Sequence, residues 1–348
     1  MKEHPLKTEI ITVRDPAAQA NDIARAAAVL RRGGLVVFPT ETVYGLGGDA
    51  TDSRAAGAIY AAKGRPSDNP LIIHVADPRD AERYAVTSPL YYKLAEQFMP
   101  GPLTVILPKK DTVPRTVTGG LDTVAVRCPS HPVAHALIAA AGVPIAAPSA
   151  NLSGRPSPTL AEHAIRDLNG RVDIILDGGP ADFGLESTIV QLHGDDATLL
   201  RPGAITPDAL ACVCHRVDIA PAVMTAMAEN ERPLSPGMKY KHYAPRAPLT
   251  LLDGDATAFL AEAAKDPAIG ILCYDEEAPA LCGKAVLFPV GARDDLTAQA
   301  HALFAALRRA DEHSELQKLY AHLPPQNGVG LALYNRLIRA AAHTVLKV

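Results

Sequence analysis

DPAAQANDIARAAAVLRRGGLVVFPT, residues 15–40, predicts a helix followed directly by a buried strand. Asp15 is placed as an N-cap with Pro16 at the first helical position, and two glycines follow the last turn, so we expect a helix over about 16–32. The apolar run LVVF then ends at a proline, as short buried strands do. A helix followed by an apolar strand is typical of a sheet covered by helices.

Similar short apolar runs recur along the chain, at LIIHVA, LTVILP, TVAVRCP, PIAAPS, VDIILDGG and STIVQL. Helical patterns fall between several of these runs, at 52–62, 88–98, 131–141 and 159–169. This mixture predicts an α/β or α+β fold with a mostly buried sheet.

The chain divides into three parts by its pattern of apolar, polar and proline residues. Residues 1–216 carry the alternating strands and helices, and residues 217–247 form a polar, proline-containing segment that we interpret as a linker. From 248 to 348 the runs LTLLDG, AIGILCY and AVLFPVG, with helices near 295–310 and 328–345, predict a smaller βαβ-type domain. We see no catalytic cluster in this second domain.

The composition narrows the class of protein. The chain has 348 residues, 48% of them hydrophobic and 21% charged, which excludes global disorder. A formal net charge of −4 argues against a protein that coats nucleic acid, although a local cationic pocket is allowed.

The N-terminal sequence has no apolar core of a signal peptide, and no window of the sequence is apolar over the length of a spanning helix, so we expect a cytoplasmic protein with no membrane contact. Five cysteines without a two-residue gap predict reduced structural thiols and no protein metal site.

The stretch KGRPSDNPLIIHV, residues 63–75, places two cations just before a strand. Lys63 and Arg65 either form a phosphate clamp or lie at the solvated end of a helix, where the macrodipole favours cations. His74 lies within the strand itself, and a lone strand histidine is more often a hydrogen-bonded core residue than a catalyst. These residues alone leave both interpretations open.

Further polar residues follow the ends of other predicted strands. PTETVYGLGGDAT, residues 39–51, taken alone fits an ordinary glycine turn better than a ligand loop. Helix capping in PIAAPSANLSGRPSPT, residues 144–159, does not explain Ser149 or Asn151. Arg127 ends one strand, and the motifs LESTIV and LLRPGAI add a serine and an arginine at two more strand ends. Hydrolase motifs are missing, so the pattern favours binding and charge stabilisation over covalent catalysis.

Taken in order, PTETVYGLGGDA, KGRPSDNPLIIHV, GPLTVILP, VAVRCPSHP, APSANLSG, ESTIV and LRPGAI closely resemble the YrdC-like family, the threonylcarbamoyl-AMP synthases. The motif SPGMKYKHYAP, 235–245, and the domain after it resemble the long, two-domain form. The resemblance implies a twisted mixed sheet with helices and a cationic cavity, followed by a smaller Rossmann-like domain. The linker is expected to cover the active site.

The resemblance also implies a reaction: L-threonine, bicarbonate and ATP give threonylcarbamoyl-adenylate and pyrophosphate, with Mg²⁺ bound through the phosphates of ATP. The product feeds threonylcarbamoyladenosine formation beside the anticodon of tRNA, a transfer completed by a separate enzyme. A weak direct contact with tRNA is also expected.

The same resemblance implies the site residues. A threonine site is expected from Thr42, His74, Arg127, Ser149 and Ser187. An ATP site is expected from Arg65, Asn69, Thr123, Asn151, Thr159, Arg201 and Tyr243. Lys63 and Arg65 form the Lys-x-Arg pair of the family and are the expected catalytic cations.

Two other functions compete with this one. An RNA-binding module without ATP chemistry would use the same cationic cavity, but the negative net charge and the 5% aromatic content argue against it. A carbamoyl-transfer module would carry zinc-finger cysteines that this sequence lacks.

Overall fold

The computed structural model describes residues 6–225, 233–235, 242–265 and 269–348. Contacts within the chain divide it into two units. The N-terminal unit contains Met1–Ser153, Pro158–Asp182 and Glu186–Lys239, and the C-terminal unit contains Gly154–Ser157, Phe183–Leu185 and Tyr240–Val348. Two short segments of the first two hundred residues therefore belong to the C-terminal unit.

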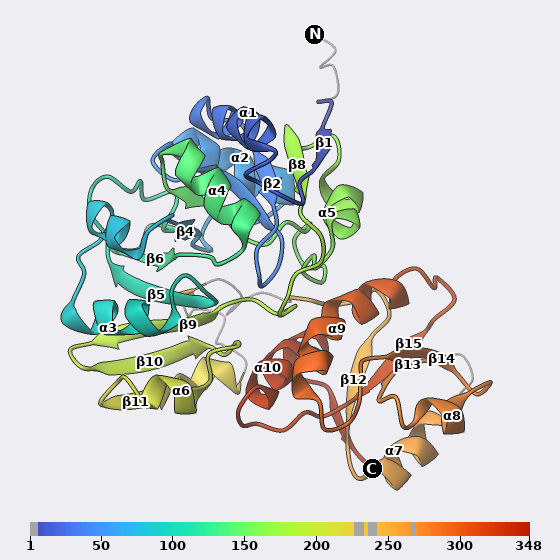
Figure 1. The fold of residues 1–348 in the computed structure, drawn as a ribbon. Coiled ribbons are helices and arrows are strands. Elements are labelled where there is room, and N and C mark those ends of the chain that lie inside the picture. The colour runs from blue at the N-terminus through green and yellow to red at the C-terminus, as the bar shows by residue number, and fades with distance from the viewer. Residues whose placement is uncertain (1–5, 226–232, 236–241, 266–268) are drawn as a thin grey trace. The chain divides into compact units, whose positions relative to one another are not determined.

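The described part of the N-terminal unit forms a mixed, eleven-stranded sheet in the order β1-β8-β2-β3-β7-β4-β6-β5-β9-β10-β11 (Figure 1). Its strands are β1 (Glu9–Thr12), β2 (Val36–Phe38), β3 (Gly45–Asp49), β4 (Ile72–His74), β5 (Leu103–Pro108), β6 (Thr123–Arg127), β7 (Ile145–Ala146), β8 (Ile174–Asp177), β9 (Thr188–His193), β10 (Asp196–Arg201) and β11 (Arg216–Ile219). Its helices are α1 (Ala20–Arg31), α2 (Ser53–Lys63), α3 (Pro89–Phe98), α4 (Pro132–Ala141), α5 (Ala161–Leu168) and α6 (Pro207–Ala211), with short 3-10 turns at Pro78–Arg83 and Pro221–Val223. The predicted α/β fold is confirmed.

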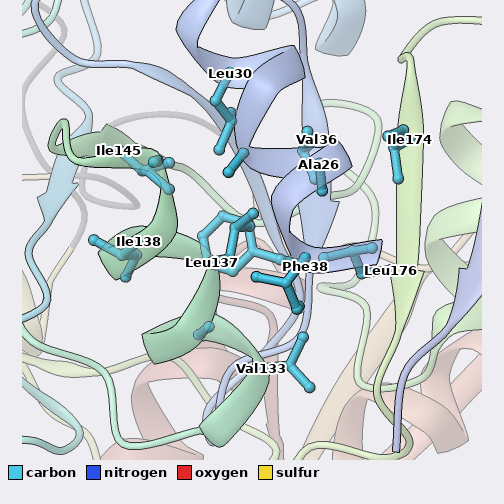
Figure 2. Packing of buried hydrophobic residues seen from close by; sticks show 14 of the residues in the cluster. Ala26, Leu30, Val36, Phe38, Val133, Leu137, Ile138, Ile145, Ile174 and Leu176 are labelled. Carbon is cyan, nitrogen blue, oxygen red and sulfur yellow. The ribbon is translucent and has the colours of Figure 1, made fainter. Parts of the chain in front are cut away.

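A hydrophobic core of this unit lies between α1, α4 and the strands β2 and β8. Figure 2 shows Leu30 of α1 and Leu137 of α4 meeting over Phe38 of β2, with Leu176 of β8 beside them. All four side chains are fully buried, and burying a side chain of this size contributes roughly 1.5–3 kcal/mol. The core therefore fixes β2, whose end leads into the loop 39–44.

The predicted first helix differs from the observed one at its start. Asp15 does not cap α1: its Oδ1 accepts hydrogen bonds from the backbone N–H groups of Ala17 and Ala18, at 2.9 and 3.1 Å, and so caps a separate turn. The helix itself begins at Ala20 and ends at Arg31. The prediction of 16–32 was wrong at the N-terminal end because Asp15 and Pro16 form this turn first.

The C-terminal unit contains a five-stranded sheet in the order β14-β13-β15-β12-β16, and every strand pair in it is parallel. The strands are β12 (Leu249–Asp253), β13 (Ile269–Cys273), β14 (Val286–Pro289), β15 (Lys318–His322) and β16 (Val345–Lys347). The helices are α7 (Ala256–Ala263), α8 (Ala278–Leu281), α9 (Leu296–Ala310) and α10 (Gly330–Ala340). A parallel sheet with intervening helices confirms the predicted Rossmann-like domain.

The last predicted helix was too long. Helix α10 ends at Ala340, and Ala342 and His343 adopt positive φ angles of 48° and 63°, which a helix cannot continue through. The residues after this turn form β16, which pairs with β12 at the edge of the sheet.

All five cysteines are free thiols. Among the described residues, no helix is long and apolar enough to cross a membrane.

Candidate active site

One face of the central strands of the N-terminal unit is apolar in the middle and polar at both ends. Thr123, Ala125 and Arg127 alternate along β6 and therefore point to the same face. Ile72 of β4 pairs with Ala125, and His74 pairs with Arg127, so these side chains share that face as well. With a rise of about 3.3 Å per residue, the two polar ends lie about 13 Å apart. This face is long enough for an extended ligand with two different polar parts.

The polar residues at the carboxyl end are His74 and Arg127. His74 is 3% exposed, and its Nδ1 lies 3.3 Å from the carbonyl oxygen of Ile145. A carbonyl only accepts, so Nδ1 carries the proton and Nε2 remains the acceptor of the ring. Burial, and then the charge of Arg127, lower the pKa of His74 to about 3. His74 is therefore a neutral hydrogen-bonding group at physiological pH.

Arg127 is held by a carboxylate that the sequence analysis did not select. Its Nη2 donates to Oε1 of Glu41 at 2.7 Å, and both side chains are buried. Its Nε donates to the carbonyl oxygen of Gly101 at 3.4 Å. The other oxygen of Glu41 accepts from the backbone N–H of Ser130 at 3.2 Å. The loop after β2 is thus tied to the end of β6.

Ser187 is linked to the same end of the sheet through β5. Thr104, which pairs with Arg127 across β5 and β6, shares a hydrogen bond of 2.8 Å between its Oγ1 and Oγ of Ser187. Arg201 donates from Nη2 to Oγ of Ser187 at 3.1 Å and from Nε to its carbonyl oxygen at 3.0 Å. The structure therefore brings Arg127, Ser187 and Arg201 together, with Thr104 between them.

Lys63 lies at the end of α2 and contacts the loop after β7. Its Nζ donates to the carbonyl oxygens of Ser149 and Asn151, the latter at 2.6 Å. Oγ of Ser149 donates to Oδ1 of Asn151 at 2.5 Å. In this arrangement the lysine ammonium orders the loop that carries Ser149 and Asn151.

Asn69 marks the other polar end. It is 1% exposed, and neither its Oδ1 nor its Nδ2 has a hydrogen-bond partner among the described residues. Arg65 lies beside it and donates from Nη2 to the carbonyl oxygens of Asn69 and Pro70, at 3.3 and 3.2 Å. Leaving a buried amide unsatisfied costs about 1–3 kcal/mol per group, so this side chain indicates a place where a polar ligand binds.

The remaining predicted residues have separate places. Thr42 is fully buried in the loop 39–44, where its Oγ1 shares a hydrogen bond of 2.8 Å with Oγ1 of Thr40. Thr159 is buried just before α5. Tyr243 belongs to the C-terminal unit, where its ring stacks on Phe304 at a centroid distance of 5.2 Å. Part of the motif around it, residues 236–241, lies outside the described residues.

Comparison with known proteins identifies the family. A family profile described as "Telomere recombination" matches residues 28–203, and one described as "Threonylcarbamoyl-AMP synthase, C-terminal domain" matches residues 205–342. The threonylcarbamoyl-AMP synthase of Bacillus subtilis is 45% identical over 98% of this chain and 97% of its own length. The chain belongs to the two-domain threonylcarbamoyl-AMP synthase family. The family fold is shared with Pyrococcus abyssi Sua5 complexed with L-threonine, which has a TM-score of 0.86 and 40% identity over 98% of this chain and all of that one.

Two residues of the candidate site, Glu41 and Thr104, were not predicted from the sequence. Glu41 stands in PTET, directly after a buried strand, where a charged residue within an otherwise uncharged loop is a usable signal. Thr104 gave no such signal because threonine is common in strands and its importance comes from its pairing with Arg127.

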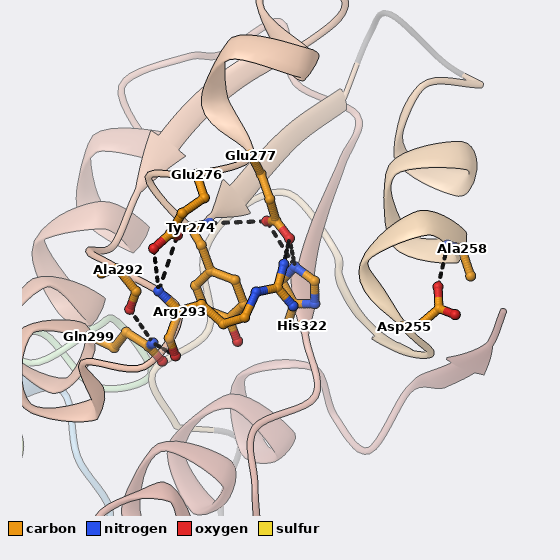
Figure 3. A network of polar contacts seen from close by, with 9 residues as sticks. All are labelled: Asp255, Ala258, Tyr274, Glu276, Glu277, Ala292, Arg293, Gln299 and His322. Carbon is orange, nitrogen blue, oxygen red and sulfur yellow. Dashed lines mark hydrogen bonds and ion pairs between the residues drawn. The ribbon is translucent and has the colours of Figure 1, made fainter.

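The C-terminal domain of this family member also contains a buried polar cluster that the sequence analysis did not select (Figure 3). Nε2 of His322 donates to both oxygens of Glu277 at 2.9 Å, and Nη2 of Arg293 donates to Oε1 of Glu277 at 2.7 Å. The His322 ring stacks between Phe259 and Tyr274, with centroid distances of 3.5 and 4.4 Å. Burial alone raises the pKa of Glu277, but the hydrogen bond from His322 and the charge of Arg293 outweigh it, so the pKa is lowered.

Proposed function

We propose that this chain is a threonylcarbamoyl-AMP synthase, which converts L-threonine, bicarbonate and MgATP into threonylcarbamoyl-adenylate and pyrophosphate. The observation that carries the proposal is the two-ended face of the sheet, with Arg127 and His74 at one end and the unsatisfied Asn69 at the other. Relatives that align over nearly the full length of this chain bear this name, which supports it.

The carboxyl end of the face suits an amino acid. Arg127 offers a guanidinium for a carboxylate, and the neutral His74 offers an acceptor for a hydroxyl or an ammonium group. The hydroxyl of Ser187 adds a neutral donor and acceptor at this end. The resemblance adds the hydroxyls of Thr42 and Ser149; Ser149 follows β7, which runs antiparallel to β4, and would approach the substrate from the amino end. These assignments follow the resemblance, and the clustering of Arg127, His74 and Ser187 supports them.

The amino end of the face suits the nucleotide. Asn69 has both an acceptor and a donor unused, and Thr123 begins β6 at the same end. Arg65 would offset the negative charge of the phosphates from this end, and Arg201, which donates to Ser187 at the carboxyl end, would do so from the other. The resemblance adds Asn151, Thr159 and Tyr243 to the ATP site. Lys63 would act with them and would also hold the loop 149–151 in place.

The reaction then needs no nucleophile from the protein. The amine of threonine adds to CO₂ derived from bicarbonate and loses a proton, and a carbamate oxygen attacks the α-phosphorus of ATP in line. The P–O bond to the leaving pyrophosphate breaks as the new P–O bond forms, and Mg²⁺ enters with the triphosphate as part of the substrate. The side chains need only position the two anionic reactants and stabilise the charge that develops in the reaction.

The product is an activated carbamate that a separate transferase would pass to tRNA, and we propose this enzyme as the functional partner. A weak direct contact with tRNA and a cytoplasmic location fit the same role.

The test is pyrophosphate release with threonine, bicarbonate and ATP each omitted in turn. We expect release only when all three are present, and release that ignores threonine would overturn the proposal. Lys63→Ala should lower turnover by roughly a hundredfold, because it removes a cation and frees the loop 149–151. Lys93→Ala, an exposed position on α3, is the control and should be unchanged. Circular dichroism checks that both variants fold.

A further inference from the structure

Glu41 and Arg127 form a buried ion pair at the place where the substrate carboxylate is proposed to bind. Their side chains are 8% and 4% exposed, and the Oε1 to Nη2 distance is 2.7 Å. Arg127 thus has a negatively charged partner before any substrate arrives.

We propose that Glu41 determines the specificity of the threonine site, by fixing Arg127 and by balancing its charge so that only a zwitterionic amino acid binds well. This inference rests on the proposed function. Glu41 is a positioning residue here, since it acts through Arg127.

Glu41 is held too firmly to be displaced by the substrate. One carboxylate oxygen bonds Arg127 and the other accepts from the N–H of Ser130, so both are used. Moving the carboxylate away would leave a buried charge without a partner, which costs several kcal/mol. The substrate carboxylate must therefore use the remaining Nη1 of Arg127, which has no partner among the described residues, while Nε and Nη2 stay on Gly101 and Glu41.

This geometry sets a charge requirement. The Glu41–Arg127 pair has no net charge, so a bound carboxylate adds a negative charge to a buried site whose other cation, Arg201, is assigned to the phosphates of ATP. His74, which pairs with Arg127 across β4 and β6, is neutral and does not offset it. An α-amino acid brings its own ammonium group and stays neutral overall, whereas a plain hydroxy acid does not. The site should therefore reject acids that lack the amine.

The first experiment uses the unmodified protein. The probe is 3-hydroxybutanoate, which is threonine without its α-amino group, tested as an inhibitor of threonine-dependent pyrophosphate release. We expect its inhibition constant to exceed the KM for threonine by roughly a hundredfold or more, since the acid brings no countercharge. Comparable values for the two compounds would overturn the inference, even if no Glu41 variant could be made to fold.

The second experiment uses Glu41→Gln, which keeps the shape of the side chain but removes its charge. Arg127 then lacks a counter-ion, so the inhibition constant of 3-hydroxybutanoate should fall about tenfold. The KM for threonine should rise, because Arg127 is less well fixed, while the KM for ATP stays within about twofold. Glu41→Asp keeps the charge and should retain the rejection of 3-hydroxybutanoate.

Glu96→Gln, an exposed position on α3, is the matched control and should behave like the native protein. A merely structural role for Glu41 predicts that the KM values for threonine and ATP rise together without any gain for 3-hydroxybutanoate, and that result would overturn the inference. Absence of threonine-dependent release from the native protein would instead overturn the proposed function, so the two failures are distinguishable.

Discussion

At the scale of single residues, the site depends on charge states that burial sets. His74 is the clearest case, because a histidine between Ile73 and Val75 in a strand gave no sequence-based reason to prefer a ligand over a core residue. The structure gives it both properties: it is buried, yet it lies beside Arg127 at the end of the proposed threonine site. Its neutrality follows from desolvation and from the neighbouring guanidinium.

The lowered pKa of His74 predicts a pH-dependent contribution to stability. The folded protein keeps the ring neutral down to a pKa of about 3, whereas the unfolded chain protonates it near the ordinary value of 6.5. The contribution is therefore present above pH 6.5 and is lost as the pH falls from 6.5 toward 3, with a slope of at most about 1.4 kcal/mol per pH unit.

His74→Gln removes this titration, so its free energy of unfolding should fall less steeply than that of the native protein between pH 6.5 and 4.5. Urea unfolding followed by circular dichroism measures the difference, since the chain has no tryptophan. The exposed His193→Gln is the control. Parallel curves for the native protein and His74→Gln would contradict the prediction.

At the scale of elements, the sequence predicted most helices because their caps are local. Asp52 and Ser88 accept hydrogen bonds from the first turns of α2 and α3, as their positions suggest. Strand order could not be predicted in this way: the pairing of β4, β6 and β5 places His74, Arg127 and Thr104 side by side, and that register comes from contacts distant in sequence. The end of α10 was missed because its turn uses non-glycine residues with positive φ.

Gly203, in the motif LRPGAI, predicts an effect at this scale. A Cβ at this position would lie 2.6 Å from the backbone N of Thr188 and 2.8 Å from the carbonyl oxygen of Glu186. Gly203→Ala should therefore displace the start of β9, which directly follows Ser187, and destabilise the protein by about 1–3 kcal/mol. The KM for threonine should rise as well, because Ser187 moves.

Gly57→Ala is the matched control, since a Cβ there meets nothing within 4 Å and α2 gains a better helix former. Thermal unfolding and the KM for threonine should be unchanged or slightly improved in the control. A Gly203→Ala protein as stable as the control would show that β9 adjusts freely, against the prediction.

At the scale of the whole molecule, the N-terminal unit contains a mixed sheet and the C-terminal unit a parallel one, and this difference decides where the polar residues of each unit meet. In the C-terminal unit all strands are parallel, so the carboxyl ends of the paired strands β13 and β15 meet at one edge. Tyr274 directly follows β13 and His322 ends β15, so both lie at this edge. Glu277 and Arg293 contact them from the loops after β13 and β14. The domain could be recognised from the sequence but the cluster could not, because its residues are spread over several loops and carry no motif.

Glu277→Gln should weaken the C-terminal unit selectively, because its contacts to His322 and Arg293 lie within that unit. Arg293 is 40% exposed, so we expect a modest loss of about 1–3 kcal/mol. Hydrogen exchange resolved by peptide should show faster exchange in β12, β13 and β15, with β4 and β6 unchanged.

The same variant has an expected pH dependence. Since the pKa of Glu277 is lowered from 4.5, its contribution to stability is present above that pH and is lost as the pH falls, so the stabilities of the native protein and Glu277→Gln should converge in acid. Glu276→Gln, the exposed neighbour, should change exchange much less; equal effects of the two variants would show that the buried cluster adds nothing beyond surface charge.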